Sequence, residues 1–596
     1  MQPPYDGTVS HMLKMLRLAL ACLLLGGVPA LAQLPVVPGE PSLTSKSATP
    51  TPILRLAPKA IPGGAKLAPV TDAEVDRLRE LNRRAPVARK RLAIGIERPL
   101  ARSASGAAVD RWIPVTGGFA IQASLTSPGA GAMRMAIDLA NVPADVEMVF
   151  FGSDAPDRLV GPVRVGDIKD RTAGWWSPLT DGETQTVEFF TRKRAGVVPI
   201  RLTRASHVFT TAASGFAKRV QEIGDSGACN VDIKCSSLQG SQAFLNARNA
   251  VAQMVFNDGG VYMCTGTLLN DTAAATQIPW FFGANHCFDN DAESAPLKTP
   301  SQMQSVANTL NTLWFFEAQA CNLRSTPAYV QLTNGAQFLY NNPQADVLFV
   351  RLNDAAPAGA FFAAWSANAV GSGASVISVH HPLGDLKKVS EGTVLGTSHP
   401  PVSGGSSQPF SEVRWSSGTT EGGSSGAGLF TFDGSQYLLR GGLWGGTALC
   451  SNLQGTDNFS RFDIVYSSLA QYLNASSGPA YDFTDLWWNP GESGWGLNLI
   501  QHPNGIIFAM WYTYDANRKM TWYHVPSGTW TSSMTYTGTL YAVAGPAFDN
   551  PTFSAAQVKR TAVGTATLSF TSATSGTWSF DVDGVRGSKP ISRLPF

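Results

Sequence analysis

The stretch "TTEGGSSGAGLF", residues 419–430, decides the fold, because it is either a flexible Gly/Ser linker or a rigid loop that holds one reactive serine. Glycine at 423 favours the loop, since it lets the backbone turn an N–H inward without a side chain clashing. A nucleophilic serine also needs a base and a group that orients the base. The second interpretation therefore requires a histidine and an acidic residue elsewhere in the chain.

Two upstream stretches supply those residues. In "WFFGANHCFDN", 280–290, His286 follows an apolar run, and the chain has only eight histidines that could act as a base. In "NNPQADVLFVRL", 341–352, Asp346 opens an apolar strand, where a carboxylate is costly unless a group such as an imidazole N–H pairs with it. The alternatives are a structural histidine in a turn and an exposed aspartate at a strand edge.

The chain order of these residues, His286, Asp346 and then Ser425, is the order of the double β-barrel serine proteases. In that frame Ser425 attacks, His286 takes its proton and Asp346 holds the imidazole. The backbone N–H groups of Gly423 and Ser425 are expected to form the oxyanion hole. Ser424 stands where trypsin-type zymogens carry the aspartate that pairs with a new N-terminus, so activation must use another route.

Residues 224–474 resemble the bacterial lysyl endopeptidases, a trypsin-like branch of the chymotrypsin-fold serine proteases. The shared motifs occur in the same order: "SGACNVDIKC" (226–235), "MCTGTLLNDT" (263–272), "GANHC" (283–287), "ADVLFVRL" (345–352), "VHHPLGDLKKVS" (379–390), "TTEGGSSGAGLF" and "GLWGGTALC" (442–450). The resemblance implies an all-β protein with a chymotrypsin-like double β-barrel and serine endopeptidase activity. His380 and His381 lack a nearby cluster of further ligands, so we expect a structural pair, no metal and no other cofactor.

Six cysteines lie between residues 229 and 450, and a seventh, Cys22, lies in an N-terminal apolar run. An even number in an exported chain indicates disulfides, but six cysteines allow 15 connectivities. The resemblance implies the three pairs Cys229–Cys450, Cys235–Cys321 and Cys264–Cys287. The last pair would hold His286 in place.

The resemblance also aligns "GTDNFSRFD", 455–463, with the segment that carries the family's lysine-binding aspartate. Asp457 would then lie at the bottom of the specificity pocket, where a carboxylate favours a cationic substrate residue; a loop aspartate that caps a turn is the alternative. Trp444, Gly445 and Gly446 stand where the family has a His-Gly-Gly wall, and the second aromatic that stacks on that histidine has no clear counterpart. We expect cleavage after Lys, with cleavage after Arg left open.

The N-terminal stretch "MLKMLRLALACLLLGGVPALAQ" has a basic front, an apolar run and a small-residue cleavage signature, which predicts a signal peptide over residues 1–32 of a secreted bacterial protein. Net charge is +2 and no basic stripe with interleaved aromatics occurs, so nucleic acid is not an expected partner, nor is a membrane after signal cleavage. A length of 596 residues indicates several domains.

We expect a propeptide over 33–219, a trypsin-like domain over 220–474 and an aromatic-rich C-terminal β domain over 481–596. The propeptide comprises a Pro-rich linker (33–70), a helix over 71–84 capped by Thr71 and Glu74, and a β-rich unit. It would assist folding and block the site until the enzyme cuts near Lys218-Arg219. The C-terminal Trp and Tyr residues either form a small core or grip glycans or peptides.

The leading hypothesis is a secreted serine endopeptidase, made as a precursor, that acts on proteins and peptides with basic residues. Two alternatives stay open: a non-catalytic binding or adhesion protein on a protease scaffold, and a serine protease of different specificity.

Overall fold

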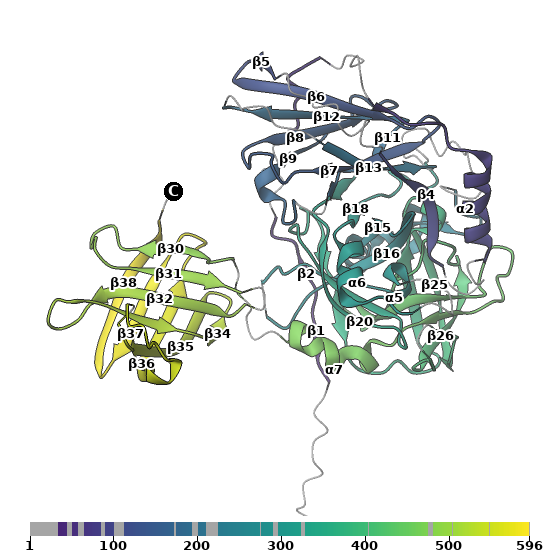
Figure 1. Cartoon of the computed structure of the whole chain (residues 1–596). Helices are drawn as coiled ribbons and strands as arrows, with labels where there is room; N and C mark the ends of the chain where they lie inside the picture. The colour runs from purple at the N-terminus through teal and green to yellow at the C-terminus, as the bar shows by residue number, and fades with distance from the viewer. Residues whose placement is uncertain are drawn as a thin grey trace, which may run out of the picture.

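A computed structural model describes residues 34–44, 51–57, 65–84, 90–100, 112–171, 174–193, 201–209, 225–273, 276–289, 296–323, 328–402, 405–474, 479, 481–502, 505–547 and 549–594. Three β-rich units follow one another along the chain (Figure 1). We refer to them as the N-terminal domain (65–209), the middle domain (225–474) and the C-terminal domain (481–594). The signal peptide and the Lys218-Arg219 site predicted from the sequence lie outside the described residues.

The N-terminal domain is a sandwich of two sheets, since one apolar cluster takes side chains from both, among them Ile121, Met135 and Phe150. Thr71 and Glu74 cap its helix reciprocally, as the capping-box spacing predicts. Its elements are β3 (Ala65–Lys66), α2 (Asp72–Arg84), β4 (Leu92–Pro99), β5 (Ile113–Val115), β6 (Gly118–Thr126), β7 (Ala132–Asp138), β8 (Glu147–Gly152), β9 (Val160–Arg164), η2 (Val165–Asp167), β10 (Trp175–Trp176), β11 (Thr180–Asp181), β12 (Thr184–Thr191) and β13 (Arg201–Val208).

The first half of the middle domain curls one antiparallel sheet around an apolar interior that includes Met254, Phe281 and Leu348. Its strands are β15 (Val251–Asn257), β16 (Val261–Leu269), β17 (Trp280–Gly283), β18 (Asn311–Trp314), β19 (Val330–Leu332), β20 (Ala336–Asn342) and β21 (Val347–Leu352). Smaller elements around it are β14 (Val231–Asp232), η3 (Ile233–Cys235), η4 (Ser237–Gly240), α4 (Gln242–Asn249), α5 (Asn285–Phe288) and α6 (Pro300–Ala307).

The second half is a closed barrel, because β29 pairs with both β26 and β28 and so joins the two ends of the sheet. Its strands are β24 (Ser375–His380), β25 (Lys388–Ser398), β26 (Phe410–Ser417), β27 (Gly428–Phe432), β28 (Tyr437–Gly446) and β29 (Asp457–Phe459); β22 (Phe361–Phe362), β23 (Ala364–Ser366), η5 (Pro382–Gly384) and α7 (Phe462–Leu473) flank it. A chain folded into two successive antiparallel barrels is the chymotrypsin-like double barrel, so the predicted fold class is confirmed.

Three disulfides brace the middle domain, and they are the pairs that the resemblance implies. Cys229 bonds to Cys450, Cys235 to Cys321 and Cys264 to Cys287. The first links residues that are 221 positions apart and so ties the start of the domain to the second barrel. Each such bridge restricts the unfolded chain and contributes about 2–4 kcal/mol.

A single strand, β4, joins the N-terminal domain to the middle domain. It pairs with β13 on one side and with β16 of the first barrel on the other, so one sheet runs through both domains (Figure 1). A shared apolar cluster lies beneath this junction and contains Leu78 and Leu92 from one domain and Val255 and Met263 from the other.

The prediction that residues 33–70 form a linker is wrong for part of that segment. Strand β1 (Val36–Val37) pairs with β23, and β2 (Glu40–Pro41) pairs with β22, so this part of the chain lies along the middle domain. The Asn270 side chain also donates a hydrogen bond to the carbonyl of Pro38. A two-residue strand is too short to show the alternation of apolar and polar residues by which strands are recognised. The Pro-rich composition of the segment therefore indicated a linker.

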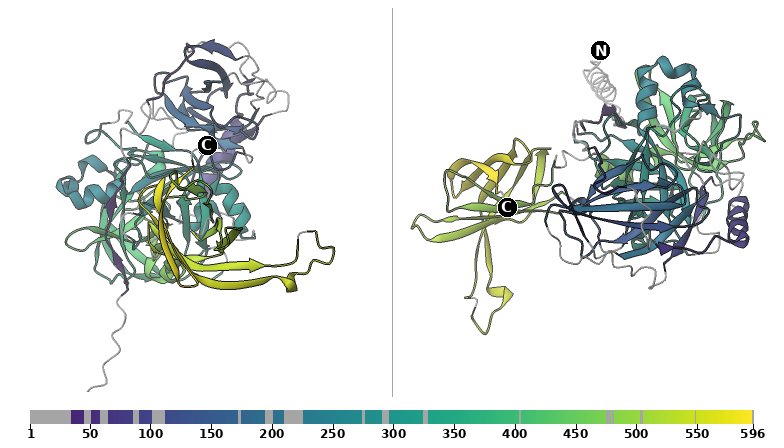
Figure 2. Two further views of the ribbon diagram at one scale, coloured as in Figure 1. Left: turned by 90° about the vertical axis from the view of Figure 1, so that its left-hand side faces the viewer. Right: turned by 90° about the horizontal axis from the view of Figure 1, so that it is seen from above.

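The C-terminal domain forms a sheet that closes on itself, because β33 pairs with both β32 and β35 (Figure 2). Its strands are β30 (Asp485–Trp488), β31 (Gly496–Gln501), β32 (Ile507–Tyr514), β33 (Met520–Val525), β34 (Gly528–Ser532), β35 (Thr535–Ala544), β36 (Lys559–Phe570), β37 (Ser575–Val582) and β38 (Val585–Arg593), with η6 at Ala555–Gln557. Trp487, Trp511 and Trp578 are buried in its core, whereas Tyr512 and Trp522 are about half exposed. The buried tryptophans are therefore candidates for the small core, and the half-exposed aromatics are candidates for contact with glycans or peptides.

Among the helices of the described ranges, none is both long and apolar enough to cross a bilayer.

Candidate active site

The structure brings His286, Asp346 and Ser425 together between the two barrels. His286 Nδ1 lies 2.8 Å from Asp346 Oδ2, and His286 Nε2 lies 2.7 Å from Ser425 Oγ. The second carboxylate oxygen of Asp346 accepts a 2.9 Å hydrogen bond from the backbone N–H of His286. This is a nucleophile, a base and an orienting carboxylate in contact, and it is the arrangement that acyl transfer needs.

Local backbone geometry fixes each of these side chains. His286 lies on α5 directly after β17, and the Cys264–Cys287 bridge ties this turn to β16. Asp346 has a φ of 51°, a left-handed conformation that is rare for a residue other than glycine and that recurs at functional sites. The turn aims its carboxylate at His286 just before β21 begins.

Gly423 has a conformation that other residues cannot easily adopt. Its φ is 91°, and a Cβ at this position would lie 2.5 Å from the Cε of Met263 and 2.9 Å from the carbonyl oxygen of His381. The hydroxyl of Thr265 donates a 3.0 Å hydrogen bond to the carbonyl of Gly423 and so fixes the peptide plane. The Gly423 N–H points at the backbone carbonyl of Lys90, to which it donates a hydrogen bond.

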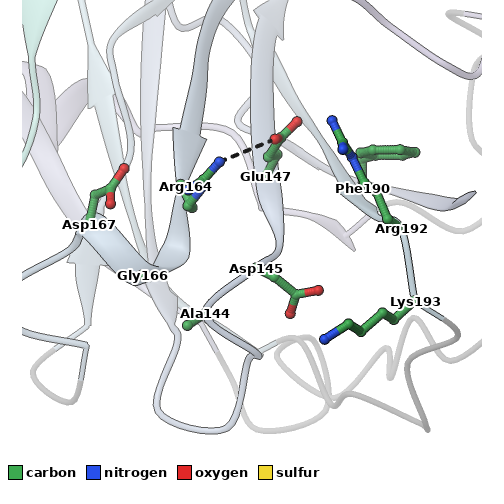
Figure 3. Close-up of a pocket in the computed structure, with 9 residues that line it drawn as sticks. All are labelled: Ala144, Asp145, Glu147, Arg164, Gly166, Asp167, Phe190, Arg192 and Lys193. Carbon is green, nitrogen blue, oxygen red and sulfur yellow. Dashed lines mark ion pairs between the residues drawn. The ribbon is translucent and has the colours of Figure 1, made fainter. Parts of the chain in front are cut away.

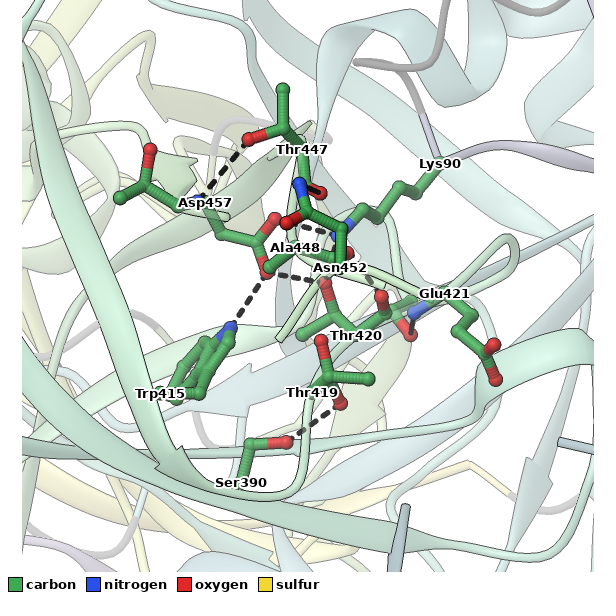
Figure 4. A network of polar contacts seen from close by, with 12 residues as sticks. Lys90, Ser390, Trp415, Thr419, Thr420, Glu421, Thr447, Ala448, Asn452 and Asp457 are labelled. Carbon is green, nitrogen blue, oxygen red and sulfur yellow. Dashed lines mark hydrogen bonds and ion pairs between the residues drawn. The ribbon is translucent and has the colours of Figure 1, made fainter. Parts of the chain in front are cut away.

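Lys90 comes from the N-terminal domain, and its side chain is buried against Thr420, Ala448 and Asp457 of the middle domain (Figure 4). Its ammonium lies 2.6 Å from Asp457 Oδ1 and donates to the carbonyls of Ala448 at 2.8 Å and of Thr420 at 3.0 Å, and to the Thr420 hydroxyl. Burial lowers the pKa of Lys90, and the carboxylate of Asp457 acts against that shift.

Asp457 lies on β29 and is the anionic partner of Lys90. It is fully buried, and its second oxygen, Oδ2, accepts hydrogen bonds from the Trp415 indole at 2.7 Å and the Thr420 hydroxyl at 2.6 Å (Figure 4). Two neutral donors thus hold one carboxylate oxygen while the other faces the ammonium. A buried carboxylate in this setting favours a cation as its remaining partner.

The predicted pocket wall lies beside Asp457 on β28. Gly446 pairs with Asp457, and a Cβ on Gly446 would lie 2.5 Å from Asp457 Oδ1, so a side chain there would clash with that carboxylate; Gly445 pairs with the next residue along β29. Trp444 is buried and meets Phe410 edge to face, with ring centroids 6.3 Å apart. Phe410 is a neighbouring aromatic that sequence reasoning missed.

Ser424, the residue before the nucleophile, forms hydrogen bonds within the protein. Its hydroxyl lies 2.9 Å from His380 Nδ1, and His380 Nε2 lies 3.0 Å from the hydroxyl of Ser390. Burial, with help from Lys90 and Lys388, lowers the pKa of His380 to about 3, so this imidazole is neutral. His380 thus links the loop residue Ser424 to β25, and the buried His381 lies next to it with its Nδ1 3.2 Å from the carbonyl oxygen of Asp385.

The start of the middle domain already contacts the nucleophile loop in the continuous chain. The N–H of Gly227 and the side-chain amide of Asn230 donate to Glu421 Oε2 at 2.9 and 2.7 Å, and Ser226 binds the carboxylate of Asp385. These contacts form without a free N-terminus. The loop is therefore assembled before any cleavage of the chain.

A second hollow, of about 570 Å³, lies on the N-terminal domain and contains none of these residues (Figure 3). Charged groups of both signs line it, including Glu147, Arg164 and Lys193. The Arg164 and Glu147 side chains lie 4.0 Å apart.

Sequence reasoning named His286, Asp346, Ser425 and Asp457. The structure joins the first three by hydrogen bonds and places Asp457 against Thr420, which belongs to the same loop as Ser425. Sequence reasoning missed Lys90, Trp415 and Thr420. No pattern in the sequence distinguishes Lys90 from its basic neighbours Arg89 and Arg91.

Two family models match the chain. One, described as the lysyl endopeptidase C-terminal domain, matches residues 223–460, and the other, described as the lysyl endopeptidase N-terminal domain, matches residues 66–209. A curated relative, the lysyl endopeptidase of Pseudomonas aeruginosa, is 34% identical over 364 residues, which are 59% of this chain and 74% of that protein.

Solved structures with some similarity include the Rv3671c protease from M. tuberculosis in its active form, at 14% identity and a TM-score of 0.27, over 39% of this chain and 85% of that one. The HtrA-type protease AlgW with a tripeptide is 13% identical with a TM-score of 0.27, over 59% of this chain and 97% of that one.

Proposed function

The chain belongs to the lysyl endopeptidase family and is a serine endopeptidase, and from that premise we propose that it is a secreted enzyme that hydrolyses peptide bonds after lysine. Ser425 attacks the carbonyl carbon of the substrate lysine while His286 takes the serine proton and Asp346 holds the imidazole. His286 then protonates the departing amine, and water hydrolyses the acyl-enzyme. The N–H groups of Gly423 and Ser425 stabilise the oxyanion; one such donor is worth about 2.7–4 kcal/mol.

The observation that carries the lysine preference is the ammonium of Lys90 on Asp457. Four oxygen atoms surround this nitrogen at the depth that a four-carbon side chain reaches. A guanidinium is wider and ends deeper, where Trp415 and Thr420 already occupy Asp457 Oδ2. We therefore propose cleavage after Lys with Arg as a poor substrate.

The N-terminal domain acts as a propeptide that assists folding and covers the site. Ser425 and His286 are both buried in the full chain, and Lys90 lies in the pocket that a substrate side chain would enter. Removal of this domain is the activating step, and Lys218-Arg219 offers a basic site for it. The three disulfides support export to an oxidising compartment.

Peptide-library cleavage by the processed, secreted protein tests the proposal, with Ser425→Ala as the inactive control. We expect cuts after Lys in at least tenfold excess over Arg, because the two side chains differ in how they fit Asp457. Equal cleavage after Lys and Arg would remove the lysine preference and keep the protease. Persistence of the full-length precursor in Ser425→Ala would support self-processing, and normal processing would exclude it.

A further inference from the structure

Lys90 makes the two contacts that define the residue before a scissile bond in a serine protease. Its backbone carbonyl accepts a hydrogen bond from the Gly423 N–H, and its side chain reaches Asp457. A side chain that only plugged the pocket would make the second contact without the first. The bond between Lys90 and Arg91 therefore lies where a substrate bond would lie.

The residues after Lys90 bind the middle domain as the departing half of a substrate would. Arg91 places its guanidinium 3.5 Å from the centre of the Tyr262 ring and 3.0 Å from Asp258 Oδ2. Leu92 is buried and opposite Met263 in the antiparallel pairing of β4 with β16. Addition of an extended strand to an exposed sheet edge is a recurrent mode of peptide recognition.

The two sides of the Lys90–Arg91 bond are also tied to each other. Asn82, on helix α2 before the bond, accepts from the N–H of Ala93 and donates to its carbonyl, both at 2.9 Å. Leu78 of the same helix packs in one apolar cluster with Leu92 and Ala93. A cut at this bond would leave the new carboxyl side and the new amine side held next to each other.

We propose that residues 90–92 are a substrate-like inhibitory segment, in which Lys90–Arg91 is the enzyme's own slowly hydrolysed bond and the Asn82–Ala93 clamp keeps the segment bound after cleavage. The proposal rests on the proposed preference for lysine. Attack by Ser425 Oγ on the Lys90 carbonyl breaks the Lys90–Arg91 C–N bond, and the serine proton passes through His286 to the Arg91 amine. This amine stays on β4, so it attacks the ester again and re-forms the peptide bond faster than water yields the Lys90 carboxylate.

The first test measures access to Ser425 in the full chain with an organophosphonate that phosphonylates nucleophilic serines. Lys90→Met keeps the apolar stem and removes the charge. It should accelerate labelling by about 10²-fold or more, since Asp457 then lies buried without its partner. Lys169→Met, an exposed lysine of the same domain, is the matched control and should label like the parent chain. Labelling of Lys90→Met at the parent rate would overturn the proposal.

The second test follows the bond itself by mass spectrometry and N-terminal sequencing of the full chain. We expect a slowly appearing N-terminus at Arg91, with both fragments eluting together under native conditions, and none in Ser425→Ala. Asn82→Ala should speed net hydrolysis by about tenfold. Without the two hydrogen bonds between Asn82 and Ala93, the new Arg91 amine is held less firmly near the ester and re-forms the peptide bond less often. Rapid hydrolysis in the parent chain with separation of the fragments would contradict the clamp.

The outcomes for this inference and for the proposed function can be told apart. If the processed enzyme cuts lysyl peptides but Lys90→Met leaves the precursor as shielded as before, only the inference fails. If the processed enzyme does not cut after lysine at all, the proposed function fails. Circular dichroism of Lys90→Met and Lys90→Arg checks that each variant folds, and Lys90→Arg should label faster than the parent if the pocket discriminates against Arg.

Discussion

The N-terminal domain extends its sheet through β4 onto β16 of the middle domain, whereas the C-terminal domain pairs β33 with β35 and closes its sheet on itself. An open edge is satisfied only by a partner, and a closed barrel has no such need. The N-terminal domain also places Lys90 on the groups proposed to bind substrate. Of the two flanking domains, one is thus built into the site, and the other carries its own complete core.

The largest effect is expected from Asp457→Asn, which tests whether the N-terminal domain and substrate bind the same carboxylate. The proposed function has substrate and the N-terminal domain share this carboxylate, so we expect kcat/KM for lysyl peptides to fall by about 10²- to 10³-fold, with a matching loss of Ser425 shielding in the full chain. Steady-state kinetics and labelling rates measure the two effects. Asp433→Asn, at an exposed turn, is the control. A loss of peptide hydrolysis without a loss of shielding would separate the two binding modes and break the comparison.

Gly423→Ala tests the backbone contact, the hydrogen bond from the Gly423 N–H to the Lys90 carbonyl, and leaves the charge of Asp457 unchanged. The new Cβ would collide with Met263 and the carbonyl of His381 at a positive φ, which turns the N–H away from the oxyanion. We expect kcat to fall by about 10²-fold. Gly434→Ala serves as control, since Gly434 also has a positive φ but has open space around it. Equal activity of the two variants would show that the Gly423 N–H is not used.

Arg134→Met separates docking from catalysis. This fully buried guanidinium of the N-terminal domain donates to the carbonyls of Val255 and Thr309 in the middle domain, at 3.2 and 2.6 Å. Its loss should destabilise the docked precursor by roughly 2–4 kcal/mol, because buried carbonyls lose a charged donor. Urea unfolding of the precursor measures this, with exposed Arg77→Met as control. Kinetics of the processed enzyme should stay unchanged, and a change there would contradict the assignment.

Acid should weaken the middle domain through His380. Its pKa is lowered to about 3 in the fold, against 6.5 for an exposed imidazole. The stability that follows from keeping it neutral is complete above pH 6.5 and is lost as the pH falls toward 3, by roughly 3 kcal/mol at pH 4. His380→Gln should flatten this dependence in urea unfolding at pH 7 and pH 4, whereas the exposed His399→Gln should not. A parallel pH slope in all three proteins would exclude His380 as the cause.

The smallest effect is expected from removal of residues 481–596. A domain with its own core and closed sheet folds independently, so kcat/KM of the processed enzyme should change by less than about twofold. Secreted yield and the melting temperature of the remaining chain complete the measurement. A loss of activity beyond tenfold would mean that the C-terminal domain contributes to the site after all.

The sequence allowed the middle domain and the positions of His286, Asp346 and Ser425 to be predicted because catalysis constrains residue type, spacing and chain order together. Asp457 was accessible through the resemblance alone, since one aspartate in a loop has no distinctive pattern. The cysteines confined one domain, but their pairing also came from the resemblance. Only for His286, Asp346 and Ser425 does the chemistry itself restrict the residues that can occur.

The contacts between domains were not predictable in the same way. Strand β4 pairs with β16 from more than 160 positions away, and nothing in its own alternation reveals that partner. Strands β1 and β2 are two residues long, and a Pro-rich composition masked them. Lys90 is one of 45 lysines and arginines, and only the fold brings it to Asp457.

The proposed inhibition by residues 90–92 would make the activity of this enzyme depend on the effective concentration of that segment near Asp457. While the chain is continuous, the inhibitory segment is presented to its pocket at a local concentration on the order of millimolar or above. Once the domains are separated, the same contacts form only by bimolecular encounter, and their occupancy falls with dilution. An enzyme released into a large volume would then lose its inhibitor without destroying it, whereas a crowded or confined space would keep the enzyme occupied.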